Sequence, residues 1–210
     1  MGRVTTHPDP AYAPGVRVRA MTLDDCAAVA EIRVRGWQTA YAGMIPQAYL
    51  DAMDIAADAD RRRKHLTAEG AGVHLVAGSP DAPVTGWACY GPCRDEDTGP
   101  GAAELYALYV HPARTGTGTG RALLAEVTAR ALADGFGSIT LWVLKDNARA
   151  RRFYERAGFR PDGAEETFEA GGATVPEVRY VRGATRRPSG SPPVHGALAG
   201  PAATAAARPA

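Results

Sequence analysis

The chain has 210 residues and a formal net charge of +1, with 45% hydrophobic and 22% charged residues. This composition is typical of a soluble globular protein with room for one full domain, and the small charge gives no reason to expect nucleic acid or a membrane as a partner. Three cysteines are too few for a disulfide scaffold, and no Cys or His pairs stand at zinc-ligand spacing. No apolar run approaches the ~20 residues of a membrane span. We therefore expect a cytoplasmic protein without a metal.

Composition divides the chain into three parts. Residues 1–15 hold several prolines and no periodic apolar pattern, which predicts a flexible leader. Residues 184–210 are rich in Pro, Ala, Gly and Ser and have little apolar bulk, so they cannot bury enough surface to offset the entropy of ordering. We expect a disordered tail there, and one folded domain over residues 16–183.

Strands and helices are predicted to alternate within this domain. A strand covers residues 16–19, and Thr22 is placed to N-cap the helix that follows. Further helices are predicted at 46–53, 57–68, 123–132 (stopping at Gly135) and 148–157, and further strands at 73–77, 84–90, 103–110, 138–144 and 177–181. The basic run Arg61–Lys64 is interpreted as a solvated helix face, with a binding patch as the less favoured alternative. This order of elements predicts an α/β or α+β sheet covered by helices.

A glycine-rich turn, residues 115–121, joins an apolar strand to an amphipathic helix. Glycines at 116, 118 and 120 let the backbone approach a ligand closely, and the N–H groups at the start of the helix form a natural phosphate site. A flexible loop that merely uses glycine to turn is the alternative. Two phosphate loops are excluded, because the P-loop lysine is missing and Leu123 stands where the dinucleotide fingerprint has its third glycine.

The turn resembles that of the GNAT superfamily of acyl-CoA-dependent N-acyltransferases. Val110-His111-Pro112 and Gly118-Thr119-Gly120 match its Val-x-Pro and Arg/Gln-x-x-Gly-x-Gly/Ala signature, although Thr115 stands where Arg or Gln is usual. A second match, residues 147–159, closely resembles the family's Asn-x-x-Ala-x-x-Phe-Tyr-x-x-x-Gly-Phe block at the expected distance. Residues 36–46 look, more weakly, like the substrate-side helices of small bacterial members.

The resemblance implies the GNAT fold, an α/β (α+β) architecture. Its mixed, mostly antiparallel central sheet contains a splayed parallel strand pair and is flanked by helices. The resemblance also implies an acyltransferase that uses acetyl-CoA as co-substrate and moves the acetyl group directly, in a ternary complex, to a primary amine of a small molecule or peptide. A non-catalytic acyl-CoA-binding or regulatory module of the same fold is the alternative. The acceptor and the oligomeric state stay open, a homodimer being one arrangement.

Cofactor contacts follow from the same resemblance. The main chain of Leu108, Tyr109 and Val110 is expected to bind the pantetheine arm. Asn147 is expected to bond the pantetheine amides, with a helix N-cap as its alternative or additional role. The pyrophosphate is expected on the amides of Thr115, Gly116, Thr117, Gly118, Thr119, Gly120 and Arg121.

Catalytic roles also follow from the resemblance. Tyr154 occupies the family's general-acid position, where its phenol would donate to the departing thiolate. Glu104 is the candidate base that removes a proton from the amine, with a solvated strand-end carboxylate as the alternative reading. Trp37 and Tyr41 are expected either to line the acceptor side or to pack as aromatic core. The weaker rivals for the base are Asp95, Glu96 and His111.

Overall fold

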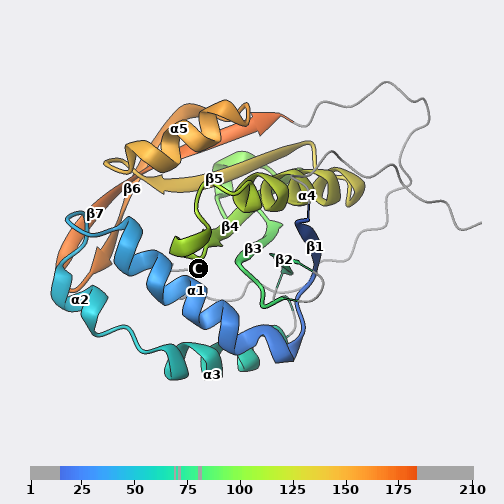
Figure 1. The fold of residues 1–210 in the computed structure, drawn as a ribbon. Coiled ribbons are helices and arrows are strands. Elements are labelled where there is room, and N and C mark those ends of the chain that lie inside the picture. Colours follow the sequence, from blue (N-terminus) through green and yellow to red (C-terminus); the bar gives the residue numbers. More distant parts are fainter. Residues whose placement is uncertain (1–14, 69, 71, 80–81, 184–210) are drawn as a thin grey trace, which may run out of the picture.

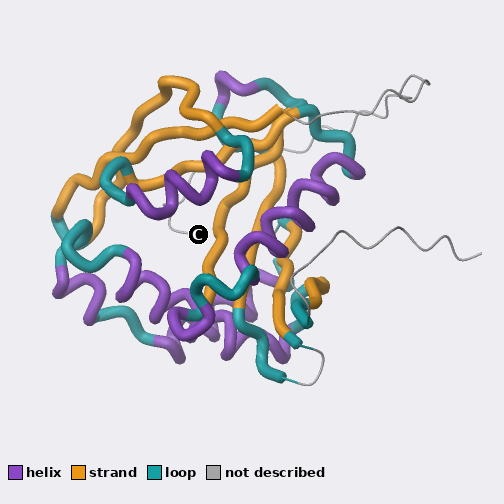
Figure 2. The backbone as a smooth tube through the Cα atoms, turned by 45° about the horizontal axis from the view of Figure 1, so that its top comes forward, coloured by secondary structure: helices purple, strands orange, loops and turns teal. Residues whose placement is uncertain are grey.

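The computed structural model describes residues 15–68, 70, 72–79 and 82–183, so the expected leader and tail lie outside the described residues, apart from residue 15. The described chain forms a seven-stranded sheet with helices on both faces (Figures 1 and 2). The strands are β1 (Arg17–Ala20), β2 (Val73–Gly78), β3 (Gly86–Pro92), β4 (Ala102–Val110), β5 (Ser138–Leu144), β6 (Arg160–Ala170) and β7 (Ala173–Gly183). The helices are α1 (Cys26–Ala40), α2 (Gln47–Asp51), α3 (Ile55–Leu66), α4 (Thr119–Ala133) and α5 (Ala148–Arg156), with short 3-10 turns at Leu23–Asp25, Glu96–Thr98 and Pro112–Arg114.

The strand order is β1-β2-β3-β4-β5-β7-β6, and every neighbouring pair is antiparallel except β4 and β5. This confirms the mixed, mostly antiparallel sheet expected from the sequence. The parallel pairing covers only Ala102–Glu104 against Ser138–Thr140. Beyond it, β4 stays paired with β3 as far as Val110, whereas β5 stays paired with β7 as far as Leu144. The two parallel strands therefore separate toward their carboxyl ends.

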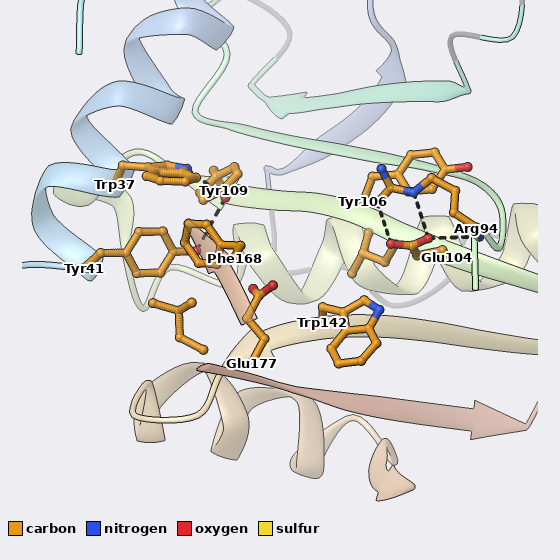
Figure 3. A pocket seen from close by; sticks show the side chains of 11 residues that line it. Trp37, Tyr41, Arg94, Glu104, Tyr106, Tyr109, Trp142, Phe168 and Glu177 are labelled. Atoms are coloured by element: carbon orange, nitrogen blue, oxygen red, sulfur yellow. Dashed lines mark hydrogen bonds and ion pairs between the residues drawn. The ribbon is translucent and has the colours of Figure 1, made fainter. Parts of the chain in front are cut away.

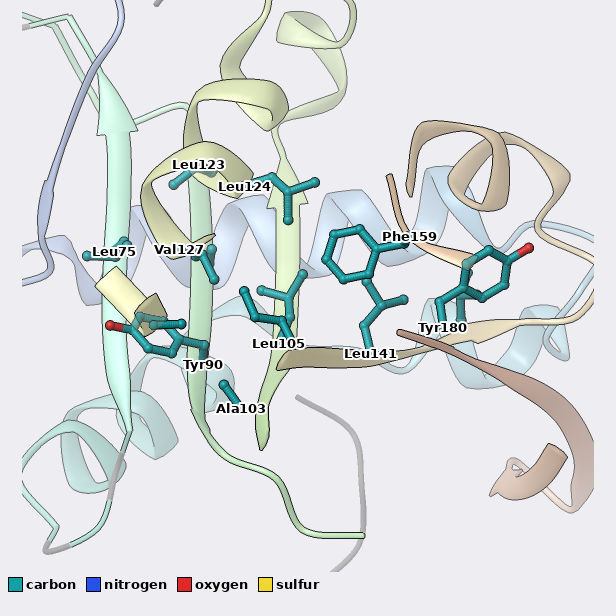
Figure 4. Packing of buried hydrophobic residues seen from close by; sticks show 14 of the residues in the cluster. Leu75, Tyr90, Ala103, Leu105, Leu123, Leu124, Val127, Leu141, Phe159 and Tyr180 are labelled. Carbon is teal, nitrogen blue, oxygen red and sulfur yellow. The ribbon is translucent and has the colours of Figure 1, made fainter. Parts of the chain in front are cut away.

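Apolar side chains pack on both faces of the sheet. Leu123, Val127 and Ala131 of α4 recur every four residues, so they share one helix face, and all three are buried against the strands. Figure 4 shows this larger cluster, whose members include Leu75, Tyr90, Leu105, Leu141, Phe159 and Tyr180. On the other face, α1 covers a second cluster that includes Val29 and Trp87. The sheet thus lies between α4 and α5 on one face and α1 to α3 on the other.

Local capping signals are present largely where the sequence placed them. The Thr22 N–H donates to Asp25 Oδ2 at 2.8 Å. Thr22 is the N-cap of a 3-10 turn that continues directly into α1. Gly135 has a φ of +93° and follows the C-cap of α4, which confirms the predicted stop. Pro46 is the N-cap of α2 and not its first helical residue as predicted.

Strand β6 is absent from the prediction. Its outer residues, such as Glu165 and Glu169, are exposed and polar, because β6 is an edge strand of the sheet. It turns into β7 through Gly171 and Gly172, whose φ values are +58° and +79°. A Gly-Gly pair is a strong hairpin signal and could have revealed the strand. With β6 as its partner, β7 is also longer than the predicted strand at 177–181.

The basic run on α3 is not wholly solvated, which corrects the sequence interpretation. The Arg62 side chain is 12% exposed, lies 4.0 Å over the Trp87 ring and pairs with Asp58 at 2.7 Å. Asp58 is 2% exposed and also accepts from Arg33 of α1 at 3.0 Å. This carboxylate therefore joins α3 to α1 inside the protein.

Replacing Asp58 should separate these two helices. We expect Asp58→Ala to lower the free energy of unfolding by about 3–5 kcal/mol, because buried guanidinium groups lose their carboxylate. The matched control is Asp60→Ala on the same helix, whose side chain is 72% exposed and pairs with Arg63. That variant should lose less than about 1 kcal/mol. Urea unfolding followed by tryptophan fluorescence measures both, and equal losses would contradict the buried role of Asp58.

Candidate active site

Beyond the parallel pairing, β4 and β5 no longer share hydrogen bonds, so main-chain groups of β4 face the space between the two strands, which we call the slot. The His111 N–H donates to the Thr85 carbonyl at 2.8 Å, so the main chain of His111 is directed to the β3 side. Direction alternates along a strand, so Tyr109 also directs its main chain to β3, and its carbonyl oxygen lies close to Gly86. The N–H and C=O groups of Leu108 and Val110 point the other way, into the slot. Of the three expected main-chain ligands, Tyr109 is therefore turned away.

A β-bulge in β4 decides which side chains share a pocket. The register with β3 shifts between Cys89 and Tyr90, so Tyr106 is an extra residue without a partner. An extra residue re-aims the side chains that follow it. Glu104, Tyr106 and Tyr109 consequently line one pocket, whereas strict alternation would turn Tyr109 to the opposite face.

Aromatic rings from α1 and its C-terminal end meet Tyr109 in this pocket (Figure 3). Trp37 Nε1 donates to the Tyr109 hydroxyl at 2.9 Å, and the Tyr41 hydroxyl lies 3.5 Å from the same oxygen. The Tyr109 ring lies beside Gly36 of α1, where a Cβ would be 3.4 Å from the ring, an ordinary van der Waals distance. Phe168 of β6 adds a ring 6.4 Å from that of Trp37. Trp37 and Tyr41 thus line the pocket and are packed as an aromatic cluster at once.

Tyr154 extends from α5 and packs edge-on against Phe153 and Phe159, with ring centroids 5.1 and 5.9 Å away. Its hydroxyl makes no hydrogen bond with any described residue. Burial raises the pKa of this phenol well above its ordinary value, and the neighbouring Tyr109 adds to the shift. Tyr154 also acts electrostatically on Tyr41. The phenol is therefore a protonated, uncommitted donor close to the pocket.

The glycine-rich turn presents a row of amides at the start of α4. Gly116 and Gly118 have φ values of +85° and +92°, and the helix begins directly after Gly118. The N–H groups of Gly118 and of residues 119–121 have no acceptor inside the helix, and the described residues supply none. The amides of Thr115 and Thr117 already donate to carbonyls three residues earlier. This narrows the expected pyrophosphate site to the amides of Gly116 and residues 118–121.

Asn147 is the N-cap of α5. Its side-chain Oδ1 accepts from the Ala150 N–H at 3.0 Å, and the residue is 7% exposed. The side-chain amide Nδ2 has no partner among the described residues. The capping role therefore leaves two N–H groups for a ligand.

Glu104 is buried and ion-paired, not solvated. It is 1% exposed, and its two oxygens accept from Arg94 Nη2 at 2.6 Å and Nε at 3.0 Å. The alternative reading of a solvated strand-end carboxylate is therefore wrong. The pair also argues against Glu104 as the direct base, because its negative charge is already engaged by the Arg94 guanidinium.

The loop that carries Arg94 is fastened from β7. The Arg179 side chain is 8% exposed and pairs with Asp95 at 3.2 Å and Asp97 at 2.6 Å, both in this loop. It also pairs with Asp162 of β6 at 2.8 Å. Asp95, one of the weaker candidates for the base, is thus an anchor of the pocket rim.

A second carboxylate of the pocket, Glu177, was not foreseen. It makes no hydrogen bond or ion pair with the described residues. Burial raises the pKa of Glu177 to about 7, the charge of Glu104 adds to the shift, and Arg94 opposes it. A glutamate at the first position of a predicted strand carries no local signal of a pocket. The other pocket residues that sequence reasoning missed are Arg94, Leu105, Tyr106, Trp142, Leu144 and Phe168.

The described residues contain neither a membrane-spanning helix nor a metal-binding cluster. Across the described residues, none of the helices is both long and apolar enough to cross a bilayer. The same part of the chain holds no group of three His, Cys, Asp or Glu side chains arranged for a metal ion. Cys26 and Cys89 are buried thiols, and Cys93 is half-buried.

Comparison with known proteins agrees with this geometry. The model of the Acetyltransferase (GNAT) family matches residues 27–159. YuaI of Bacillus subtilis, an uncharacterized N-acetyltransferase, is 35% identical over 164 residues, which cover 78% of this chain and 90% of that protein.

Two solved structures share the fold. PaiA N-acetyltransferase from Thermoplasma acidophilum, in complex with coenzyme A, has a TM-score of 0.62 and 20% identity, covering 80% of this chain and 98% of that one. YncA from Salmonella typhimurium, with its cofactor acetyl-CoA, has a TM-score of 0.58 and 22% identity, covering 82% and 96%. The family match spans more than half of the chain and includes the glycine-rich turn and Tyr154. The chain is therefore an acyltransferase that belongs to the GNAT family of acetyltransferases.

Proposed function

We propose that the protein moves an acetyl group from acetyl-CoA directly to a primary amine of a small molecule or peptide, with both substrates bound in one ternary complex. The observation that carries the proposal is the slot between β4 and β5, faced by the main chain of Leu108 and Val110. The glycine-rich turn follows one end of β4, and the aromatic pocket lies along the same strand. A thioester held in the slot could thus meet an amine that enters from the pocket.

The described residues offer polar partners for the pyrophosphate, the pantetheine arm and the acyl group of acetyl-CoA. The free amides of Gly116 and residues 118–121, at the positive end of α4, suit the pyrophosphate. Leu108 and Val110 can pair with the pantetheine arm as a further strand would, and the Asn147 amide can donate to it. A main-chain N–H near Val110 can stabilise the acyl oxygen as negative charge develops.

Proton transfer sets the demands on the catalytic side chains. Deprotonating an alkylamine of pKa ~10.4 at pH 7 costs roughly 4.6 kcal/mol, whereas an α-amino group near pKa ~8 costs only about 1.4 kcal/mol. A base therefore matters most for alkylamines.

On the other side, a phenol is a weaker acid than a thiol by about 1.5 pKa units, so full proton transfer from Tyr154 to a thiolate is uphill by at least ~2 kcal/mol. Tyr154 then acts by donating a hydrogen bond to the departing sulfur and relaying a proton to it.

The proposed function predicts amine-dependent release of thiol. Acetyl-CoA would be incubated with phenethylamine, spermidine, glycinamide or a peptide with a free N-terminus, and thiol and acetylated amine would be quantified. We expect acetylated product from at least one of these amines in proportion to the thiol. Calorimetric binding of acetyl-CoA without product from any amine would instead support the non-catalytic module.

Substitution of Gly118 should weaken coenzyme A binding. Gly118→Ala places a Cβ among the free amides and also imposes strain of ~1–2 kcal/mol at positive φ. The matched control is Gly135→Ala at the other end of α4, where φ is +93° and a Cβ would meet nothing within 4 Å. We expect at least ~10-fold weaker acetyl-CoA binding by calorimetry for the first variant and near wild-type affinity for the second. Equal effects on affinity would assign the loss to strain alone.

Removal of the Tyr154 hydroxyl should slow the chemical step. Tyr154→Phe keeps the packing against Phe153 and Phe159, so acetyl-CoA affinity should stay nearly unchanged while kcat falls about 10²-fold or more. Tyr90→Phe is the control, since its hydroxyl donates to Asp134 at the C-terminal end of α4, away from the slot. Single-turnover measurements with an amine acceptor distinguish the two variants. A wild-type rate in Tyr154→Phe would rule out the donor role.

A further inference from the structure

The pocket holds two carboxylates in opposite settings, and only one of them has a cationic partner within hydrogen-bond distance. Glu104 is committed to Arg94, whereas Glu177 makes no hydrogen bond or ion pair with the described residues. Given the proposed transfer to an amine, we propose that Glu177 is the carboxylate that receives the ammonium group of the acceptor and takes its proton.

The place of Glu177 in the sheet supports this role. It stands opposite Leu144, the last residue of β5, and therefore at the end of the strand that has moved away from β4. Figure 3 shows its side chain pointing from β7 into the space bordered by Tyr41, Phe168 and Trp142. A carboxylate beside aromatic rings is a suitable receptor for an organic ammonium ion, because the ring faces also attract cations.

The charged groups around Glu177 leave it without a cationic partner within hydrogen-bond distance among the described residues, so this carboxylate is available to bind a cation. On β7 itself, Arg179 points to the same side of the strand, but it is paired with three aspartates. On β6, Glu166 lies directly opposite in the ladder and adds negative charge nearby. Across the pocket, the other charged or titratable groups are Glu104 with its partner Arg94, and the phenols of Tyr41, Tyr106 and Tyr109.

The surroundings of Glu177 bring its pKa into the range in which a carboxyl takes up and releases a proton near neutral pH. Burial raises its pKa to about 7, with a further contribution from Glu104. A general base is most effective when its pKa lies near the working pH, and two carboxylates whose environments differ commonly divide their roles. Tyr41, which stays protonated because burial raises its pKa well above the ordinary value, is close enough for the charge of Glu177 to act on it.

The proton and electron balance of the transfer is complete with this assignment. Glu177 takes one proton from the ammonium, and the freed nitrogen lone pair forms the C–N bond to the acetyl carbon as the C–S bond breaks. The attached nitrogen then loses a second proton, which reaches the departing sulfur by way of the Tyr154 hydroxyl. Glu177 returns its proton to solvent, so that the net reaction releases one proton, the amide and the free thiol.

The first test needs no substrate. A carboxyl whose pKa is raised by folding lowers the stability of the protein as pH rises from its unfolded-state pKa to its folded-state pKa, because the unfolded chain loses the proton first and the buried charge must then form in the folded state. Urea midpoints of wild type, Glu177→Gln and the matched variant Glu104→Gln would be compared from about pH 5 to about pH 9. We expect Glu177→Gln to gain stability relative to wild type as the pH rises from about 5 to about 7 and to keep that gain at higher pH, and Glu104→Gln to lose stability at every pH because the Arg94 pair is broken. A difference in urea midpoint between wild type and Glu177→Gln that stayed constant with pH would overturn the assignment.

The second test uses the pH dependence of kcat/KM with the best amine from the panel. Wild type should rise to a plateau above about pH 7, whereas Glu177→Gln should be ~10²-fold slower there and continue to rise toward the pKa of the amine. Glu104→Gln should keep a plateau that begins at lower pH, because the charge that helps to raise the pKa of Glu177 is removed. An unchanged profile in Glu177→Gln, or loss of the plateau in Glu104→Gln alone, would contradict the role of Glu177. If wild type acetylates no amine, the proposed function fails, and the urea comparison still decides whether Glu177 is the ionisable carboxylate described.

Discussion

The whole site depends on the point at which β4 and β5 stop sharing hydrogen bonds. Their parallel pairing ends at Glu104 and Thr140, yet neither strand is left without support, because β3 holds one and β7 the other. The main-chain groups of Leu108 and Val110 are thereby left facing an opening. Main-chain N–H and C=O groups away from water need partners, so the slot is prepared for a ligand with amide groups of its own. Pantetheine is such a ligand, which is why the proposed function begins with this strand pair.

The contents of the pocket follow from a departure from regular structure in β4. The bulge at Tyr106 turns the Tyr109 side chain to the α1 side of the sheet, where its ring lies beside Gly36. Aromatic rings can then surround a small space beside the slot, with Trp37 donating to the Tyr109 hydroxyl. Rings of this kind form rigid walls, because few side-chain torsions must be ordered. The same residues therefore act as core and as lining, and the two roles do not compete.

Charge is distributed unevenly around this space. Arg179 ties the rim loop to β6 and β7 through three aspartates, and Arg94 neutralises Glu104. These pairs are structural, since each carboxylate is already engaged by a guanidinium. Glu177 lacks such a partner among the described residues, and burial makes its charged form costly near neutral pH. A positively charged acceptor would relieve that cost, which connects the electrostatics of the pocket to the chemistry proposed for it.

Contiguous motifs determined much of this protein from sequence alone. The family, the main elements, the glycine-rich turn and the placement of Asn147 at a helix start were all legible, because each depends on residues close together in the chain. The tertiary structure alone decided which carboxylate is free. Glu104 meets Arg94 across the β3–β4 loop, and Glu177 reaches the pocket from a strand beyond β5, paired with the unforeseen β6. Desolvation and ion pairing are set by neighbours distant in sequence, so no local pattern could distinguish the two glutamates.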